Sequence, residues 1–470
     1  MIDLYKIIIF YIFIFTTSTI IISYGRSFSE LFKIKISCIS INIIFGCFIL
    51  GSLALIINFF LPINIFVGNI ILLIGFVLII KNANFLRKEL FLILIISSIA
   101  FITGIYENIN RPDAALYHLP FISNLNENKI ILGLNNLHSR FGLVSFLQYV
   151  SAVFYNSLFK DKLIFFPNLI LFASSLIYFF KICIDKTASN EIKILSLFFA
   201  IAIVLDMNRF SEFGNDENAH MLYFILISQI IIFYINKNIS IQNTTNIILF
   251  ISLFLFMIKI TYSLVILFVI LIVSKSLKEF KFFDGFKLFL YFIFFAWLLK
   301  NFFISGCFLY PIEFSCVDKI SWTYNANIDS VIIEGWAKGY PDTNLNLPIE
   351  KYIKNLNWLG TWLNNHSLFI LKKLLLLLII FILIVIFINK KGIELNFRKE
   401  LKIILIINLF FCCVWFLKFP VYRFGSGFLI SGILLTTIIF FKRINLHNYD
   451  KALKISIVLT LILLCYKNLD

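Results

Sequence analysis

Charged residues are scarce in this chain of 470 residues, because only 14% are Asp, Glu, Lys or Arg while 61% are hydrophobic. Soluble proteins are about 25% charged and roughly 45–50% apolar, so this sequence has too few polar side chains to cover a surface in water. The mean hydropathy of +0.96 agrees. The composition excludes soluble globular enzymes, disordered proteins and fibrous repeats, and it predicts an integral membrane protein.

Other familiar signals are also missing. The N-terminus has no basic segment, and no small-residue cleavage site follows its first apolar run. A secretory signal peptide has both, so we expect Tyr5–Ile22 to be retained as a span. The eight cysteines lack zinc-binding spacing. No internal repeat and no low-complexity linker is visible.

The net charge of +16 does not indicate a nucleic-acid partner. The Lys and Arg residues form short clusters between apolar runs, with no continuous basic face. Positive charge in short loops is typical of the cytoplasmic side of a membrane protein. The expected partner of the chain as a whole is therefore a lipid bilayer.

Apolar runs long enough to cross a bilayer recur along the sequence. About 20 residues are needed, so we predict an all-α polytopic helical membrane protein with about 12–14 transmembrane helices. Ile247–Val273 is interrupted by Lys259, so it is one tilted span or two short ones turning near that lysine. Phe141–Phe159 is less apolar, and we expect a non-spanning helix at the interface. The other expected spans are Tyr5–Ile22, Cys38–Phe60, Ile63–Ile80, Leu90–Ile105, Leu163–Ile182, Ile192–Leu205, Ala219–Ile235, Leu288–Ile304, Ser367–Ile388, Leu401–Leu417, Phe424–Phe441 and Leu453–Cys465.

The basic clusters orient these spans. They lie in short loops that alternate with two long polar segments, Glu107–Arg140 and Ser305–His366, and with an acidic turn. The positive-inside rule then places the long segments and the acidic turn outside the cytoplasm. The expected divisions are 1–106 (N-terminal transmembrane helices), 107–162 (first extracytoplasmic loop with juxtamembrane helices), 163–304 (central helices), 305–366 (second extracytoplasmic loop) and 367–470 (C-terminal helices).

The first outer segment contains Arg111-Pro-Asp-Ala-Ala-Leu-Tyr-His-Leu-Pro120. Its chemically useful side chains are Arg111, Asp113, Tyr117 and His118. Pro112 suits the first turn of a helix, and Pro120 is expected to end or bend it. Asp113 beside His and Arg suits a general base or a metal ligand. Helix capping with an interfacial Tyr and His is the alternative.

The same segment continues with Leu134-Asn-Asn-Leu-His-Ser-Arg-Phe-Gly142, which adds His138 and Arg140. The Arg140 guanidinium is suited to bidentate contact with a phosphate. An interfacial arginine on a loop is the alternative.

The acidic turn before the Ala219–Ile235 span contains Asp206, Glu212, Asp216, Glu217 and His220. Asp216 and His220 are one helical turn apart on one face, and Asp216 or Glu217 is a second catalytic candidate. Carboxylate and imidazole ligands suit Mg or Mn, so the candidate metal ligands are Asp113, Asp216 and His220. Some of these acids instead complement the dipole of the next helix in the simpler interpretation.

Two basic residues adjoin spans on the same side. Lys259 lies inside apolar sequence, where a lysine costs roughly 3 kcal/mol and should face a cavity, a partner or the surface. Arg423, in Lys418-Phe-Pro-Val-Tyr-Arg-Phe-Gly-Ser-Gly427, opens a span. Both are candidates to bind a lipid phosphate, and snorkelling is the alternative for Lys259.

The second outer segment begins with Ser305-Gly-Cys-Phe-Leu-Tyr-Pro311 and holds Cys307 and Cys316. Outside the cytoplasm these two cysteines can form a disulfide; otherwise they are free thiols. The segment also has aromatic residues suited to stacking on sugars or to an interfacial belt: Trp322, Trp336, Tyr340, Trp358 and Trp362.

Taken in order, these motifs resemble the polytopic GT-C glycosyltransferase superfamily, especially members from bacterial capsule and lipopolysaccharide clusters. The resemblance covers roughly residues 100–430. It rests mainly on Asp113 with Tyr-His-Leu-Pro at 117–120, on Asn-Leu-His-x-Arg-Phe-Gly at 136–142, and on Ser-Gly-x-x-x-Tyr-Pro at 305–311. Four expected spans precede Asp113, whereas the superfamily commonly has one.

The resemblance implies transfer of a sugar from a polyprenyl-phosphate carrier to a glycan or lipid acceptor, on the outer face of a bacterial cytoplasmic membrane. Asp113 would be the base or metal-associated acid, and Asp216 or Glu217 would assist. Lys259 and Arg423 would meet the carrier phosphate. An O-antigen-like polymerase or ligase, and a flippase or transporter of lipid-linked sugars, are the rival functions, although a transporter should carry more ionisable residues within its spans.

Overall fold

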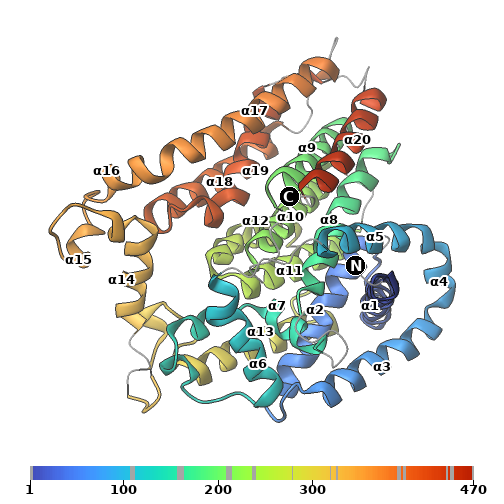
Figure 1. Ribbon diagram of the computed structural model, residues 1–470. Coiled ribbons are helices and arrows are strands. Elements are labelled where there is room, and N and C mark those ends of the chain that lie inside the picture. The colour runs from blue at the N-terminus through green and yellow to red at the C-terminus, as the bar shows by residue number, and fades with distance from the viewer. Residues whose placement is uncertain are drawn as a thin grey trace.

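The computed structural model describes residues 4–36, 38–105, 112–155, 164–207, 214–235, 240–277, 279–317, 319–323, 326–388, 393–394, 398–440, 443–444 and 449–467. These residues form a bundle of helices (Figure 1) and one small pair of strands. The prediction of an all-α polytopic helical protein is confirmed.

The N-terminal half of the chain contains five helices, a polar segment with short helices, and a second group of long helices. The first five are α1 (Leu4–Leu31), α2 (Ile39–Asn58), α3 (Ile65–Lys81), α4 (Ala83–Lys88) and α5 (Leu90–Ile105). The polar segment holds the π-helical turn η1 (Ala114–His118), α6 (Leu119–Glu127), the 3-10 turns η2 (Leu134–Asn136) and η3 (Ser139–Leu143), and α7 (Phe146–Val153). Then come α8 (Phe166–Ile184), α9 (Asn190–Asp206), α10 (Asp216–Ile235) and α11 (Ile241–Ile258).

The C-terminal half repeats this order of long helices around a polar segment. It has the 3-10 helix η5 (Ile260–Val265), α12 (Ile266–Ser276) and α13 (Gly285–Ser305). The second polar segment contains η6 (Glu313–Ser315), α14 (Ala326–Ala337), η7 (Tyr340–Asp342), α15 (Ile349–Tyr352), α16 (Leu359–Trp362) and η8 (Leu363–Ser367). The last elements are α17 (Leu368–Ile388), β1 (Ile393–Glu394), α18 (Arg398–Lys418), α19 (Tyr422–Phe440), β2 (Arg443–Ile444) and α20 (Tyr449–Lys467). The strands β1 and β2 pair antiparallel.

Within the described residues, nine helices are long and apolar enough to cross a membrane, and three shorter apolar helices accompany them. The chain is a multi-pass membrane protein. Many large apolar side chains on the outside of the bundle are exposed, for example those of Phe91, Ile386 and Phe440. This is expected of a surface that faces the hydrocarbon of a bilayer. Figure 1 shows α16 and α17 as one long helix at the edge of the bundle, and 359–387 is a single apolar stretch.

Lys259 divides the long apolar run into two helices. Its backbone is extended, with φ −151° and ψ 119°, so α11 ends there and η5 and α12 follow in a new direction. Of the two possibilities that the sequence left open, the turn near the lysine is the one observed. The turn places the Lys259 ammonium at a helix end, where it reaches a carboxylate described below.

The helix predicted for Phe141–Phe159 is shorter than expected, and its residues are buried within the protein. The described part is α7, eight residues long and therefore too short to span, and all of its residues are buried. It packs against α2, α3 and α8. The prediction of a non-spanning helix holds for this part, and the helix is covered by other helices of the protein. The polar residues that suggested an interface serve inside the bundle: Ser145 and Gln148 form a capping box at the start of α7.

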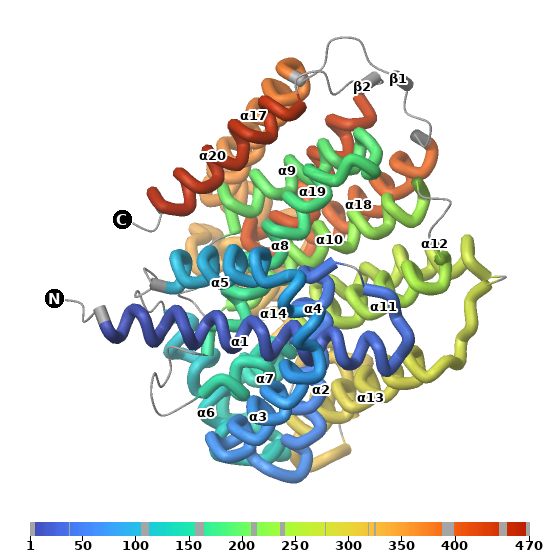
Figure 2. Tube along the Cα trace, turned by 90° about the vertical axis from the view of Figure 1, so that its right-hand side faces the viewer, coloured from blue at the N-terminus to red at the C-terminus, as the bar shows by residue number. Residues whose placement is uncertain are grey.

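The first two helices approach each other closely because both carry glycine at the contact. A Cβ at Gly25 would collide with the Asn42 carbonyl oxygen, and a Cβ at Gly46 would collide with the Ile21 carbonyl oxygen. Small residues allow such backbone contact between membrane helices. Figure 2 shows α1 lying beside α3 and α5, which pack on it as well.

Candidate functional site

Two ion pairs lie at one end of the helix bundle. The Arg423 Nη1 atom is 3.2 Å from Asp113 Oδ2, and the Lys259 Nζ atom is 2.5 Å from Asp216 Oδ1. Asp113 precedes η1, Asp216 opens α10, Lys259 follows α11 and Arg423 lies in the first turn of α19. The side chains remain accessible, with 31% of Asp113 and 28% of Asp216 exposed. Residues 310 positions apart therefore meet where a substrate can reach them.

A π-helical turn shapes the segment between Asp113 and Pro120. The Leu119 N–H bonds to the Ala114 carbonyl, five residues back, and α6 begins with Pro120 in its first turn. Proline has no N–H to continue the ordinary α-helical pattern. Pro120 was expected to end or bend this helix; instead the chain stays helical and absorbs the proline by widening the preceding turn. Such π-turns often occur at functional sites.

The widened turn presents an aromatic patch next to the ion pairs. The ring of Tyr117 lies 4.2 Å from that of His118 and 6.4 Å from that of His138, between ring centroids. Burial raises the pKa of Tyr117, and the Asp113 carboxylate raises it further while Arg423 opposes. The phenol therefore stays protonated and can donate a hydrogen bond. Arg140 affects the Tyr117 pKa as well, yet its guanidinium has no carboxylate partner among the residues that the structure describes.

Gln148 fixes the tautomer of His118. The amide Nε2 of Gln148 donates to His118 Nδ1 at 2.7 Å, while the amide oxygen accepts the backbone N–H of Ser145. Because Nδ1 accepts, the neutral ring carries its hydrogen on Nε2. Burial lowers the pKa of His118 from 6.5 to about 4, although Asp216 and Asp113 act in the opposite direction. His118 is thus a neutral hydrogen-bond donor at physiological pH.

The depressed pKa of His118 predicts a loss of stability in acid. Between pH 6.5 and about 4 the unfolded chain binds a proton at this histidine and the folded chain does not. The midpoint of thermal unfolding should therefore fall as the pH drops through that window, and it should fall less steeply in His118→Gln. Unfolding curves of both proteins from pH 7 to 4 test this. Parallel slopes would contradict the assignment, and Gln148→Glu should flatten the slope by raising the pKa of His118.

His220 is a structural residue and not the exposed ligand that its spacing suggested. Only 2% of it is exposed. Its Nε2–H donates to the backbone carbonyl of Arg423 at 2.8 Å, so Nδ1 accepts from the Tyr262 hydroxyl at 2.5 Å. A Cβ at Gly427 would collide with both side chains. His220 therefore holds α10, η5 and α19 together and positions Arg423.

Asp206 also has a structural role. Its carboxylate pairs with Lys373 at 2.6 Å and accepts from the Tyr422 hydroxyl at 2.8 Å, which ties α9 to α17 and α19. Glu217 lies in the first turn of α10 and adds negative charge near Lys259. Arg111 and Glu212 lie outside the described residues.

The donor set does not fit a metal centre. No group of three or more His, Cys, Asp or Glu side chains converges within the described residues. His220 uses both ring nitrogens, and Asp113 and Asp216 each hold a basic partner. The expectation that Asp113, Asp216 and His220 bind Mg or Mn together was wrong for His220, and no catalytic step is assigned to a metal.

An apolar cavity adjoins the ion pairs. Its volume is about 390 Å³, and its lining includes Phe411, Trp415, Phe424 and Phe428. The Phe424 ring faces both cations, with Lys259 Nζ at 4.3 Å and Arg423 Cζ at 5.0 Å from its centroid. A second apolar cavity, of about 360 Å³ between α11, η5 and α13, also includes Ser263 in its lining. The two cavities are therefore neighbours at η5.

The second long polar segment covers the site from one side. Trp336 of α14 lies under the Arg423 guanidinium, 5.4 Å from its Cζ. Glu334 of the same helix pairs with Lys338 at 2.5 Å and with Lys418 of α18 at 3.1 Å. Cys307 and Cys316 are joined by a disulfide at the start of this segment.

Three contributing residues were not singled out from the sequence: Gln148, Tyr262 and Phe424. Gln148 is a polar residue inside an apolar helix, a pattern that could have marked it. Tyr262 and Phe424 stand beside Lys259 and Arg423 in stretches rich in aromatic residues, where nothing distinguishes them.

A family profile described as "Domain of unknown function (DUF8201)" matches residues 5–430. The match covers most of the chain, which therefore belongs to this family. No curated protein and no solved structure matches the chain.

Proposed function

We propose that this member of the DUF8201 family is a membrane glycosyltransferase that moves a sugar from a polyprenyl-phosphate-linked donor to a glycan or lipid acceptor. One observation carries the proposal: two carboxylate–cation pairs lie beside an apolar cavity. Phe424 connects them, because its ring contacts both cations and also lines the cavity. A polyprenyl phosphate has these two needs, positive charge for its phosphate and an apolar surface for its chain.

The reaction requires a base and compensation for a leaving anion. An acceptor hydroxyl attacks the anomeric carbon, a carboxylate takes its proton, and the bond to the phosphate oxygen breaks to release polyprenyl phosphate. Asp113 is the base in this proposal, and Asp216 with Glu217 assists. Arg423, Lys259 and Arg140 bind the phosphate, whose negative charge grows in the transition state.

The ion pairs supply a way to activate the base only when donor is present. Arg423 and Lys259 each hold a carboxylate in the absence of substrate. A phosphate competes for the same cations because it accepts charge-assisted hydrogen bonds strongly. Its binding releases a carboxylate to accept the acceptor's proton. Neutral Tyr117 and His118, with His138 beside them, line the sugar side as hydrogen-bond donors and stacking surfaces.

The orientation belongs to the same proposal. The site lies at the end of the bundle that carries the two long polar segments, and the short basic loops such as 183–191 lie at the other. The positive-inside rule then places the site at the periplasmic or exterior face of a bacterial cytoplasmic membrane. Such a location suits the synthesis of cell-envelope polysaccharide.

Sugar transfer by the purified protein tests the function. Wild-type protein in nanodiscs, given a panel of radiolabelled polyprenyl-phosphate sugars and a membrane glycolipid extract, should form labelled product and release polyprenyl phosphate. The control is the double variant Asp113→Asn, Asp216→Asn. A ladder of lengthening lipid-linked glycan would instead identify a polymerase. Movement of donor across the bilayer with no bond broken would identify a flippase.

A further inference from the structure

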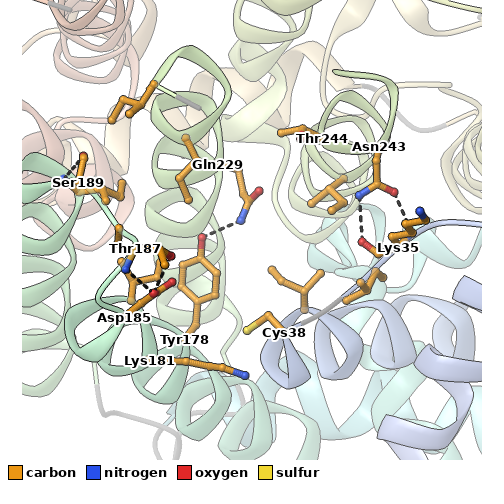
Figure 3. Close-up of a pocket in the computed structure, with 18 residues that line it drawn as sticks. Lys35, Cys38, Tyr178, Lys181, Asp185, Thr187, Ser189, Gln229, Asn243 and Thr244 are labelled. Atoms are coloured by element: carbon orange, nitrogen blue, oxygen red, sulfur yellow. Dashed lines mark hydrogen bonds between the residues drawn. The ribbon is translucent and has the colours of Figure 1, made fainter. Parts of the chain in front are cut away.

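A further pocket, distinct from the two apolar cavities beside η5, lies at the other end of the bundle. It has a volume of about 390 Å³ and is lined by the α1–α2 connection, the end of α8, the start of α9, the end of α10 and the start of α11 (Figure 3). The site described above lies at the start of α10 and the end of α11. Asp216 of the first site and Gln229 of this pocket are 13 positions apart on α10, which is about 20 Å at 1.5 Å per residue. The pocket is therefore a separate site.

Hydrogen bonds hold two of its walls, one set between distant segments and one within a turn. The Asn243 side chain accepts the backbone N–H of Lys35 at 2.8 Å and donates to the Lys35 carbonyl at 2.9 Å, which fixes the α1–α2 connection to α11. On the other side, Asp185 Oδ1 accepts from the backbone N–H of Thr187 at 2.8 Å and from its hydroxyl at 2.7 Å. The pocket is thus formed in advance, without a ligand.

The pocket wall offers polar atoms that lack a partner among the residues that the structure describes. Tyr178 is only 2% exposed, and its hydroxyl oxygen accepts from Gln229 Nε2 at 2.7 Å. Within the described part of the chain, the hydroxyl hydrogen of Tyr178 has no acceptor, and the amide oxygen of Gln229 has no donor. Figure 3 shows these two groups meeting in the pocket, with Lys181 extending from the same helix as Tyr178.

The charges and the apolar lining restrict what fits. Lys181 and Lys35 supply positive charge on two walls, and Asp185 supplies one negative charge. Isoleucine side chains form much of the remaining lining, at positions 36, 41, 182, 192, 232, 235 and 247. An anionic oxygen matches Lys181 and the Tyr178 hydroxyl, while a neighbouring donor group matches Gln229 and Asp185. Hydrocarbon matches the isoleucines.

We propose that this pocket binds a phosphate ester whose alcohol part carries an amine or hydroxyl donor. Lys181 and the Tyr178 hydroxyl hold the phosphate, and the Gln229 and Asp185 oxygens accept from the donor group. A phospholipid headgroup and a soluble phosphate ester share this chemistry. The proposal does not depend on the sugar-transfer function, because no residue of the pocket belongs to that site.

Binding by charge-matched variants tests the proposal. Lys181→Gln removes the ammonium from the pocket, and Lys186→Gln removes an exposed lysine five positions along that does not line it. Tyr178→Phe removes only the hydroxyl. Native mass spectrometry would count phosphatidylethanolamine retained by each protein, and a thermal-shift titration with glycerol 3-phosphate would measure binding of a soluble ester.

We expect phosphatidylethanolamine retention to fall about tenfold in Lys181→Gln and in Tyr178→Phe, as for loss of a charge-assisted hydrogen bond, and to be unchanged in Lys186→Gln. Binding of glycerol 3-phosphate that is lost in the same two variants would support the proposal with a soluble ester as the ligand. Equal binding of both probes by wild type, Lys181→Gln and Lys186→Gln would overturn it. Unfolding midpoints near that of wild type show that the variants are folded.

Discussion

Replacing Asp113 by Asn is expected to lower the rate of sugar transfer about a thousandfold, since general-base catalysis contributes roughly 10²–10⁴. Asn keeps the size of the side chain and can still accept a hydrogen bond from Arg423, 3.2 Å away in the wild type. It cannot take a proton from the acceptor. The effect should therefore appear in kcat, measured with saturating donor, more than in donor binding.

A nearby carboxylate provides the matched control. Glu127, at the end of α6, is exposed and accepts a hydrogen bond from the Ser123 hydroxyl at 2.8 Å. Glu127→Gln removes the same charge from the same outer segment and should leave transfer near the wild-type rate. Wild-type activity in a folded Asp113→Asn protein would remove Asp113 from the chemistry, and Asp216 would then be the base to test.

Removal of Lys259 should have the largest effect on folding among the residues of the site. In Lys259→Met the partly exposed Asp216 carboxylate loses an ammonium partner at 2.5 Å, and the lysine side chain that is removed is only 12% exposed. Breaking a fully buried pair costs about 3–5 kcal/mol, and partial exposure of the carboxylate reduces the expected cost to about 2 kcal/mol. We expect a lower free energy of unfolding in detergent and strongly reduced transfer, because a cation that binds the phosphate is lost too.

Two further variants separate the contributions. Lys259→Met combined with Asp216→Asn leaves no unpaired charge, so stability should largely return while transfer stays low. Lys418→Met breaks a pair whose lysine is 57% exposed and whose partner Glu334 keeps Lys338, so it should cost less than about 1 kcal/mol. Comparable destabilisation by Lys259→Met and Lys418→Met would show that the Asp216 pair has no special energetic role.

The sequence was sufficient to predict a helical, multi-pass membrane protein. Uninterrupted apolar runs report directly on burial in lipid, because a backbone in hydrocarbon must be helical. The meeting of Asp113 with Arg423 and of Asp216 with Lys259 follows once those segments are placed at one end. Helix packing determines which acid pairs with which base, and no local sequence pattern predicts this pairing.

The errors arose where a residue's partner lies far away in the sequence. His220 was identified by its spacing from Asp216, but its role is set by Tyr262 and by the backbone of Arg423, 203 positions away. The polar residues of α7 did not reveal the capping box that Ser145 and Gln148 form, or the contact of Gln148 with His118, because that contact joins segments 30 positions apart. Pro120 was read by its usual effect, and the π-turn that accommodates it depends on the surrounding packing.

The apolar cavities that share Ser263 of η5 have a consequence for how the proposed polyprenyl-phosphate donor would reach the site. They are lined by side chains of the bundle next to lipid-exposed residues such as Ile266 and Ile270. A donor that uses this surface arrives by diffusion within the plane of the bilayer. The rate at which the site meets a donor then depends on the surface density of the carrier, which is the number of carrier molecules per lipid. It does not depend on the volume of the surrounding solution.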